Sequence, residues 1–257
     1  MKQSTNNLDR DNVRQFLNLI AILAAFGINV LANVAPINGL TIGAISNTLF
    51  REVLVTPANY AFAIWGIIYL GLVSFGVYQV LPAQRQNPTV RRMGYLLILA
   101  CLAQICWVVL FQNRLFTLSL VAMLGILLPL IRIYLRLEIG KQEVSRTHKW
   151  LIHIPLSIYL AWISVATIVN VALTLYNLGW SGWGINPQLW TVIALIIGAA
   201  IATAVSIVRA DMAFTLVIIW AFVAIAVRQA AQPLIALTAG GLAIALGLVL
   251  LLSRLRR

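Results

Sequence analysis

The sequence predicts an all-α protein, a polytopic bundle of transmembrane helices, and three observations support this fold class. Of the 257 residues, 62% are hydrophobic and only 9% are charged, whereas a soluble domain carries about 45–50% apolar and about 25% charged residues. Eight stretches are apolar over roughly the length that crosses a bilayer. The Lys and Arg residues gather in alternate connections between these stretches. So few charges cannot cover a water-facing surface, which excludes a soluble globular enzyme, and the high hydrophobicity excludes intrinsic disorder.

The eight apolar stretches define the expected helices. None of them shows the alternation of a strand, and a backbone exposed to lipid must satisfy its hydrogen bonds internally, which favours helices. The fourth and the seventh stretch are the shortest. In order, the stretches are 16–35, 59–81, 93–111, 115–131, 152–176, 189–208, 212–227 and 233–252.

The distribution of basic residues predicts the topology. If all eight stretches span, both termini and the even-numbered connections share one side and carry 15 of the 18 Lys and Arg residues, while the other side holds only Arg51, Arg114 and Arg228. Because basic residues accumulate on the cytoplasmic side, this split predicts an integral, multi-pass membrane protein with cytoplasmic N- and C-termini. The formal net charge of +12 is therefore explained by orientation and lipid headgroups, and nucleic acid is not expected as a partner.

Side chains for acid–base or metal chemistry are scarce. The six acidic residues all fall in connections or at helix ends, which weighs against an ion-coupled pump. No phosphate-binding loop, nucleophile elbow or zinc-protease motif occurs. Cys101 and Cys106 are expected to be packing residues, and His148 and His153 have no further metal ligands at a suitable spacing. We therefore predict neither a metal site nor a set of catalytic residues.

Two connections stand out in the chain. The connection 36–58 is long and carries scattered apolar residues, so it is either a lid over the end of the bundle or a loop at the membrane interface. The fifth connection is rich in Gly and Trp, and Trp180, Trp183 and Trp190 are expected to be interfacial anchors. This connection also divides the chain into a five-helix domain, 1–180, and a three-helix extension, 181–257.

Polar and aromatic side chains inside the stretches are expected to face the bundle interior, because polar groups in lipid turn inward and bond across helices. Each alone is explained by helix–helix packing. Together they describe an apolar pocket with a few orienting polar groups, suited to a flat hydrophobic ligand. These residues are Asn29, Asn33, Gln104, Trp107, Trp162, Thr167 and Asn170.

Three segments resemble motifs of the tryptophan-rich sensory protein/translocator protein (TspO/MBR) family. TPANYAFAIWGIIYLGLVSFGVYQ (Thr56–Gln79) is similar to the family's second helix, and LAQICWVVLFQN (Leu102–Asn113) to its third. IPLSIYLAWISVATIVNVALTLYNL (Ile154–Leu178) is similar to the fifth helix and matches its pattern most completely. The resemblance covers about residues 14–178, leaving the last three helices outside the family's usual five.

The resemblance implies a pocket inside the five-helix bundle, under the first loop, that binds porphyrins, sterols or synthetic aromatic ligands. Trp65 and Trp162 stand at the positions of the second-helix and fifth-helix tryptophans that the family implicates in tetrapyrrole contact. The full set of expected ligand-binding residues is Trp65, Tyr69, Gln104, Trp107, Tyr159, Trp162 and Asn170. Three departures from the family pattern are Gln104 in place of an asparagine, Asn59 in place of a tryptophan, and the missing sterol-recognition pattern after the fifth helix. Because this last pattern is missing, sterol is not the expected ligand.

The leading hypothesis is a membrane receptor or sensor that binds a tetrapyrrole or a similar flat hydrophobic molecule. The runner-up is a small-molecule permease or facilitator that uses all eight helices, and a third hypothesis is a porphyrin-degrading enzyme, which rests on the resemblance alone. No cofactor is required for the leading hypothesis, since porphyrin or haem would be the ligand. The expected partners are membrane lipids and the hydrophobic ligand, and a homodimer is left open.

Overall fold

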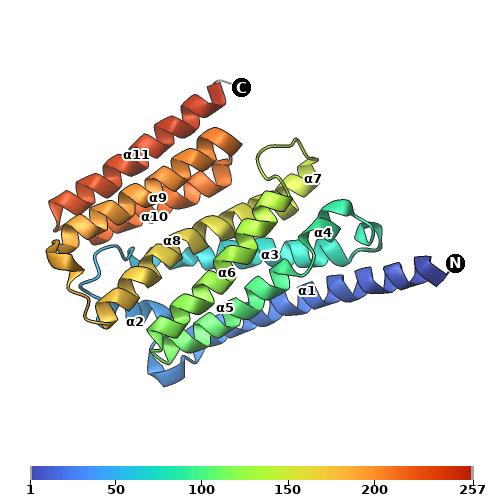
Figure 1. Ribbon diagram of the computed structural model, residues 1–257, viewed down its shortest axis with the longest axis horizontal. Coiled ribbons are helices and arrows are strands. Elements are labelled where there is room, and N and C mark those ends of the chain that lie inside the picture. Colours follow the sequence, from blue (N-terminus) through green and yellow to red (C-terminus); the bar gives the residue numbers. More distant parts are fainter. Residues whose placement is uncertain (1, 256–257) are drawn as a thin grey trace.

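The computed structural model describes the backbone of residues 2–255 and the side chains of residues 11–253, and these residues form a bundle of helices (Figure 1). The described residues contain no strand. Eight long helices coincide with the eight predicted stretches, which confirms the all-α polytopic fold. They are α1 (Lys2–Val34), α3 (Ile64–Val80), α5 (Leu96–Gln112), α6 (Phe116–Arg136), α8 (Ile154–Asn177), α9 (Pro187–Arg209), α10 (Met212–Arg228) and α11 (Pro233–Leu255).

Short helical turns fill the connections. Residues Asn59 to Ala63, expected at the start of the second long helix, form a separate turn before α3. The short elements are η1 (Ile37–Gly39), α2 (Ile42–Thr48), η2 (Asn59–Ala63), η3 (Pro82–Gln84), α4 (Pro88–Met93), α7 (Arg146–His148), η4 (Lys149–His153) and η5 (Gly182–Gly184).

Six segments of the described chain have the length and hydropathy of a membrane span, one of them α3 together with η2 (Asn59–Val80). Helices α5 and α10 have 17 residues each and, like α3 without η2, are shorter. Seventeen residues rise about 25 Å, the lower end of what crosses a bilayer. The expectation that the fourth stretch is among the shortest is wrong, since α6 has 21 residues. The helix continues through Arg132 and Arg136, which the apolar run did not include, because long basic side chains can reach the interface from a helix end.

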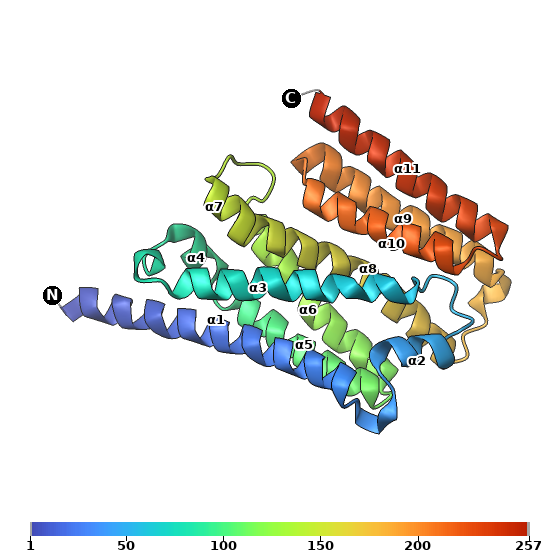
Figure 2. The same cartoon turned by 180° about the vertical axis from the view of Figure 1, so that it is seen from behind.

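Two groups of helices pack on either side of α8. Helices α1, α3, α5 and α6 lie on one side. On the other side, α9 and α10 pack against α8, and α11 packs on the outer side of α9 and α10 (Figures 1 and 2). Buried side chains from Ala21 to Leu246 form one continuous hydrophobic core across both groups. The connection between the groups is the one that contains η5, where the sequence divides the chain. Whether the first 180 residues form an independent domain stays a prediction.

Glycines in α3 let neighbouring helices approach closely. A Cβ added at Gly71 would lie 2.9 Å from the Cβ of Pro155 in α8, and one added at Gly76 would lie 2.9 Å from a side-chain carbon of Leu19 in α1. Small residues at such contacts are how transmembrane helices pack in the absence of a hydrophobic driving force. Helix α3, which carries Trp65, is thereby fixed between α1 and α8.

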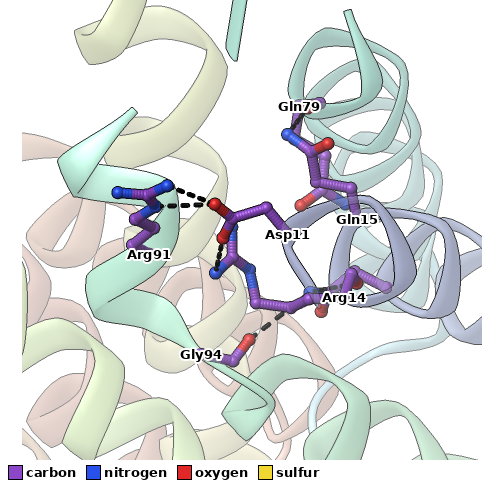
Figure 3. Close-up of polar contacts among 7 residues, drawn as sticks. Asp11, Arg14, Gln15, Gln79, Arg91 and Gly94 are labelled. Atoms are coloured by element: carbon purple, nitrogen blue, oxygen red, sulfur yellow. Dashed lines mark hydrogen bonds and ion pairs between the residues drawn. The ribbon is translucent and has the colours of Figure 1, made fainter. Parts of the chain in front are cut away.

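A buried polar cluster ties α1 to α4 at the end of the bundle where the N-terminus lies (Figure 3). The Asp11 carboxylate pairs with Arg14 at 2.7 Å and accepts a hydrogen bond of 2.9 Å from Nε of Arg91. Gln15 Nε2 donates to the backbone oxygen of Gln79 in α3. The hydrogen bond that Arg91 donates to the Asp11 carboxylate raises the pKa of the Arg91 guanidinium. The polar turn of α1 from Asp11 to Gln15 is therefore held against α3 and α4.

The predicted topology can be tested with reporter fusions. Eight spans with cytoplasmic termini place Gly182, after the fifth long helix, and the C-terminus on opposite sides of the membrane. We expect a periplasm- or lumen-active reporter to work at Gly182 and a cytoplasm-active reporter to work at the C-terminus. Activity of the same reporter at both positions would contradict eight crossings.

Candidate ligand pocket

A pocket lies between the loop after α1 and helices α3, α5 and α8. It is partly open to the outside, and its volume of about 490 Å³ includes the space at its mouth. Its walls are almost wholly apolar and aromatic. The lining residues are Ile42, Ser46, Pro57, Phe62, Trp65, Trp107, Phe111, Trp162, Val165, Ala166, Val169, Asn170 and Leu173.

Three tryptophans from three different helices contribute to the walls, and each contacts a second aromatic ring. Trp65 stacks on Tyr69 with ring centroids 5.6 Å apart, and Trp107 stacks on Phe111 at 5.2 Å. Trp162 meets Phe62 edge to face at 6.0 Å. Trp107 and Trp162 are buried and Trp65 is half-buried. Offset and edge-to-face pairs of this kind are favourable aromatic geometries, so each indole is held in place by a neighbour.

Asn170 orients one of the tryptophans. Its Oδ1 accepts a hydrogen bond of 2.7 Å from Nε1 of Trp107, and its Nδ2 donates to Ser119 Oγ at 3.2 Å and to Thr174 Oγ1 at 3.4 Å. The residue is only 2% exposed. The partners of this buried amide come from α5, α6 and its own helix α8. The amide therefore fixes the rotamer of Trp107 and, with it, the shape of the pocket wall.

The structure brings together four of the seven predicted site residues. Trp65, Trp107, Trp162 and Asn170 all line the pocket.

The other three predicted residues lie behind the lining. Tyr159 is fully buried, its ring lies 6.2 Å from that of Trp65, and its hydroxyl donates to Gln104 Oε1 at 3.4 Å. Tyr69 donates to the backbone oxygen of Ala25 at 3.1 Å. These side chains support the wall from one layer deeper and do not line the pocket.

The loop after α1 covers the pocket. Thr41 caps α2 by accepting a hydrogen bond of 3.1 Å from the backbone N–H of Ala44, and Ile42 and Ser46 of this helix line the pocket together with Pro57. Of the two alternatives left open by the sequence, a lid or a loop at the interface, the contacts favour the lid.

Two expectations for inward-facing residues need correction. Asn29 is buried, but the side chain of Asn33 is exposed and donates to the backbone oxygen of Asn29 at 2.8 Å. Such bonds to the preceding turn satisfy a polar side chain without a partner helix. Thr167 is half-buried and likewise donates to its own helix, to the oxygen of Ile163.

Arg51 and the asparagines are polar residues of the loop that could reach the pocket mouth. Arg51 is exposed and does not line the pocket. A different cation, Arg228 of α10, lies at the rim and donates to Asn47 Oδ1 at 2.6 Å and to the backbone oxygen of Pro57 at 3.3 Å. The only signal for Arg228 in the sequence is its place among the three basic residues on the less basic side.

The pocket itself carries no acid–base group, since none of its lining side chains is Asp, Glu, His, Lys, Cys or Tyr. Across the side chains that the structure describes, no three His, Cys, Asp or Glu residues are grouped so as to hold a metal ion. The site is suited to bind an apolar, flat molecule through contact area and aromatic stacking.

The comparisons with known proteins agree with this geometry. A family model described as "TSPO-like protein" matches residues 15–252, nearly the whole chain and including the last three helices. No curated protein and no solved structure matches the chain. The chain belongs to the TSPO-like family of integral membrane proteins.

Proposed function

We propose that this protein is a membrane receptor or sensor that binds a tetrapyrrole, or a similar flat hydrophobic molecule, in the pocket under the first loop. The observation that carries the proposal is the convergence of Trp65, Trp107 and Trp162 from three helices on one apolar cavity. The TSPO-like family match supports a receptor of this kind.

Contact with the indoles provides the binding free energy in this proposal. Each aromatic pair contributes about 0.5–1.5 kcal/mol beyond the burial of apolar area. A planar macrocycle can contact more than one indole at once, because the three indoles line the same cavity. Asn170 is engaged with Trp107, so the ligand is recognised mainly by shape and aromatic surface.

The position of the pocket favours a receptor over a permease that needs all eight helices. Every lining residue lies between Ile42 and Leu173, and none comes from α9, α10 or α11. A second cavity, of about 380 Å³, does lie between α8, α9 and α10, but its lining is apolar except for Ser164. Neither of these two cavities has a polar lining, which favours the receptor over the permease.

The proposal is tested by titrating the detergent-purified protein with protoporphyrin. Trp65→Phe and Trp162→Phe each keep an apolar ring but lose contact area and the indole N–H. We expect each change to weaken the affinity by about 5- to 30-fold, which corresponds to about 1–2 kcal/mol. The readout is the quenching of protein fluorescence together with the shift of the porphyrin absorption band.

Trp190→Phe is the matched control. Trp190 lies at the start of α9, in a cluster with Trp180 and Trp183, and its Nε1 donates to the oxygen of Gly182 at 2.9 Å. It does not line the pocket, so its replacement should leave the affinity unchanged. Unchanged affinity in both pocket variants, or an equal loss of affinity in all three variants, would show that the two tryptophans serve helix packing and not ligand binding. Thermal midpoints measured alongside separate binding from folding.

A further inference from the structure

The loop over the pocket is bonded to α10, a helix that contributes nothing to the pocket walls. Nη1 of Arg228 donates to Asn47 Oδ1 at 2.6 Å and to the oxygen of Pro57 at 3.3 Å, and Nη2 donates to the oxygen of Ser46 at 3.5 Å. Ser46 and Pro57 both line the pocket. One guanidinium therefore bridges two separate parts of the pocket cover, a task that suits its rigid fork of donors.

Asn47 extends this bridge into the second half of the loop. While its Oδ1 accepts from Arg228, its Nδ2 donates to Oδ1 of Asn59. Asn59 is the residue that stands where the resemblance to the TspO/MBR family predicts a tryptophan. The asparagine that departs from the family pattern thus forms a hydrogen bond within the loop, to Asn47, and Asn47 is in turn bonded to Arg228 of α10.

Three further contacts join the loop to α10 along more than two turns of the helix. Gln229 Nε2 donates to the oxygen of Leu54 at 2.9 Å, and the backbone N–H of Ala58 donates to the oxygen of Ala224 at 3.0 Å. Trp220 Nε1 donates to the oxygen of Ala61 at 3.3 Å. Hydrogen bonds to α10 are therefore spread along the segment from Ser46 to Ala61.

The beginning of the loop has a different anchor. Gln112 at the end of α5 donates to the oxygen of Leu40 at 3.4 Å and accepts from the backbone N–H of Ile37 at 3.4 Å. Phe50 adds a ring contact with Phe116, with centroids 4.7 Å apart. Glu52 accepts a hydrogen bond of 3.2 Å from the hydroxyl of Tyr176 in α8. The loop is thus attached to the five-helix group at its start and through Phe50 and Glu52, whereas Ser46, Asn47 and Pro57 are bonded to α10.

We propose that α10 positions the loop over the pocket and that Arg228 is the positioning residue on which ligand exchange depends. Entry or release of a bulky ligand must displace Ser46 or Pro57, and each is bonded to the same guanidinium. Charge-assisted bonds are stronger than neutral ones, so their rupture sets the rate at which the pocket opens. The last three helices then have a role in binding although they form none of the wall. The effect on ligand exchange rests on the proposed function, whereas the positioning of the loop does not.

The test compares Arg228→Gln with the unchanged full-length protein in detergent. Hydrogen exchange is measured first without ligand, and the N–H of Ala58, bonded to α10, is the direct reporter. We expect exchange in residues 44–61 to rise by about 10-fold, with the rest of the bundle unchanged. The dissociation rate of protoporphyrin should rise by about 5- to 30-fold. Arg228→Lys should show smaller increases in both rates than Arg228→Gln, because an ammonium can still reach one of the acceptors.

Arg209→Gln is the matched control. Arg209 also ends a helix, α9, and donates to a backbone oxygen, that of Ile139 at 3.0 Å, but it does not contact the loop or the pocket. Its replacement should change neither loop exchange nor the dissociation rate.

Each other outcome decides a specific point. Unchanged exchange in residues 44–61 of Arg228→Gln overturns the positioning role, whatever the ligand does. Faster exchange throughout α8 and α10 also overturns it, because Arg228 would then support the bundle as a whole. Faster loop exchange with an unchanged dissociation rate overturns the control of ligand exchange. Faster loop exchange in a protein that binds no protoporphyrin contradicts the proposed function and leaves the positioning role standing.

Discussion

Replacing Asp211 by alanine is expected to destabilise the protein by about 3–5 kcal/mol, the largest effect that we predict. Asp211 is only 7% exposed, and its Oδ2 accepts hydrogen bonds from the hydroxyls of Tyr134 at 2.8 Å and Ser157 at 2.6 Å. Its Oδ1 caps α10 by accepting from the backbone N–H of Phe214 at 3.1 Å. Alanine removes the cap and leaves two buried hydroxyls without their acceptor. We expect the thermal midpoint in detergent to fall by roughly 10 °C.

Two further variants separate these contributions. Asp211→Asn keeps one oxygen, which can serve either the helix cap or the hydroxyls but not both sets fully, so its loss of stability should lie between those of wild type and alanine. Glu143→Ala removes a carboxylate from the exposed connection before α7 and should change stability by less than about 0.5 kcal/mol. Equal midpoints for Asp211→Ala and Glu143→Ala would contradict the anchoring role of Asp211.

Asp211 also shows how far the sequence could predict the structure. The polar break between two apolar runs predicted a helix boundary there, and Asp is a favoured capping residue. The partners Tyr134 and Ser157, on α6 and α8, are far away in the sequence. Local patterns determine where helices begin and end, whereas the packing of whole helices determines which side chains meet at their ends.

For the pocket, the family resemblance and the inward-facing polar residues predicted the correct helix faces but not the depth of each side chain. Tyr69 follows Trp65 by four residues and Gln104 precedes Trp107 by three, so each shares a face with its tryptophan. One helical turn is about 5.4 Å, which suffices to move a side chain out of a small cavity. Only the tryptophan of each pair lines the pocket.

Arg228 illustrates a contact that no local pattern reveals. The sequence distinguished it only by its side of the membrane, while its acceptors Asn47 and Pro57 lie more than 170 residues earlier. Its importance depends on how α10 packs against η2 and α8. The same limit applies to Phe62 and Phe111, which line the pocket but look in the sequence like any other apolar residue of a membrane helix.

Replacing Asn170 by leucine is expected to cost about 2–3 kcal/mol of stability, although leucine has the same branched arrangement of heavy atoms. The Nε1–H of Trp107 would lose its acceptor in a buried site, and an unsatisfied buried donor costs about 1–3 kcal/mol. The bonds to Ser119 Oγ and Thr174 Oγ1 would be lost as well. Protoporphyrin affinity should also fall, because the ring of Trp107 would no longer be held against the pocket. Thermal unfolding and titration of the same sample measure both effects.

A double-mutant cycle with Trp107→Phe tests whether this bond is the cause. Phenylalanine has no N–H, so in the Trp107→Phe background the change Asn170→Leu leaves no orphaned indole donor. Replacing both partners of a hydrogen bond is far less costly than removing one, and we expect the double variant to be more stable than the sum of the single losses by about 1–2 kcal/mol. Strictly additive losses would mean that Asn170 acts through Ser119 and Thr174 alone. In that case the amide would hold α6 and α8 together, and the orientation of Trp107 would depend on its stacking with Phe111.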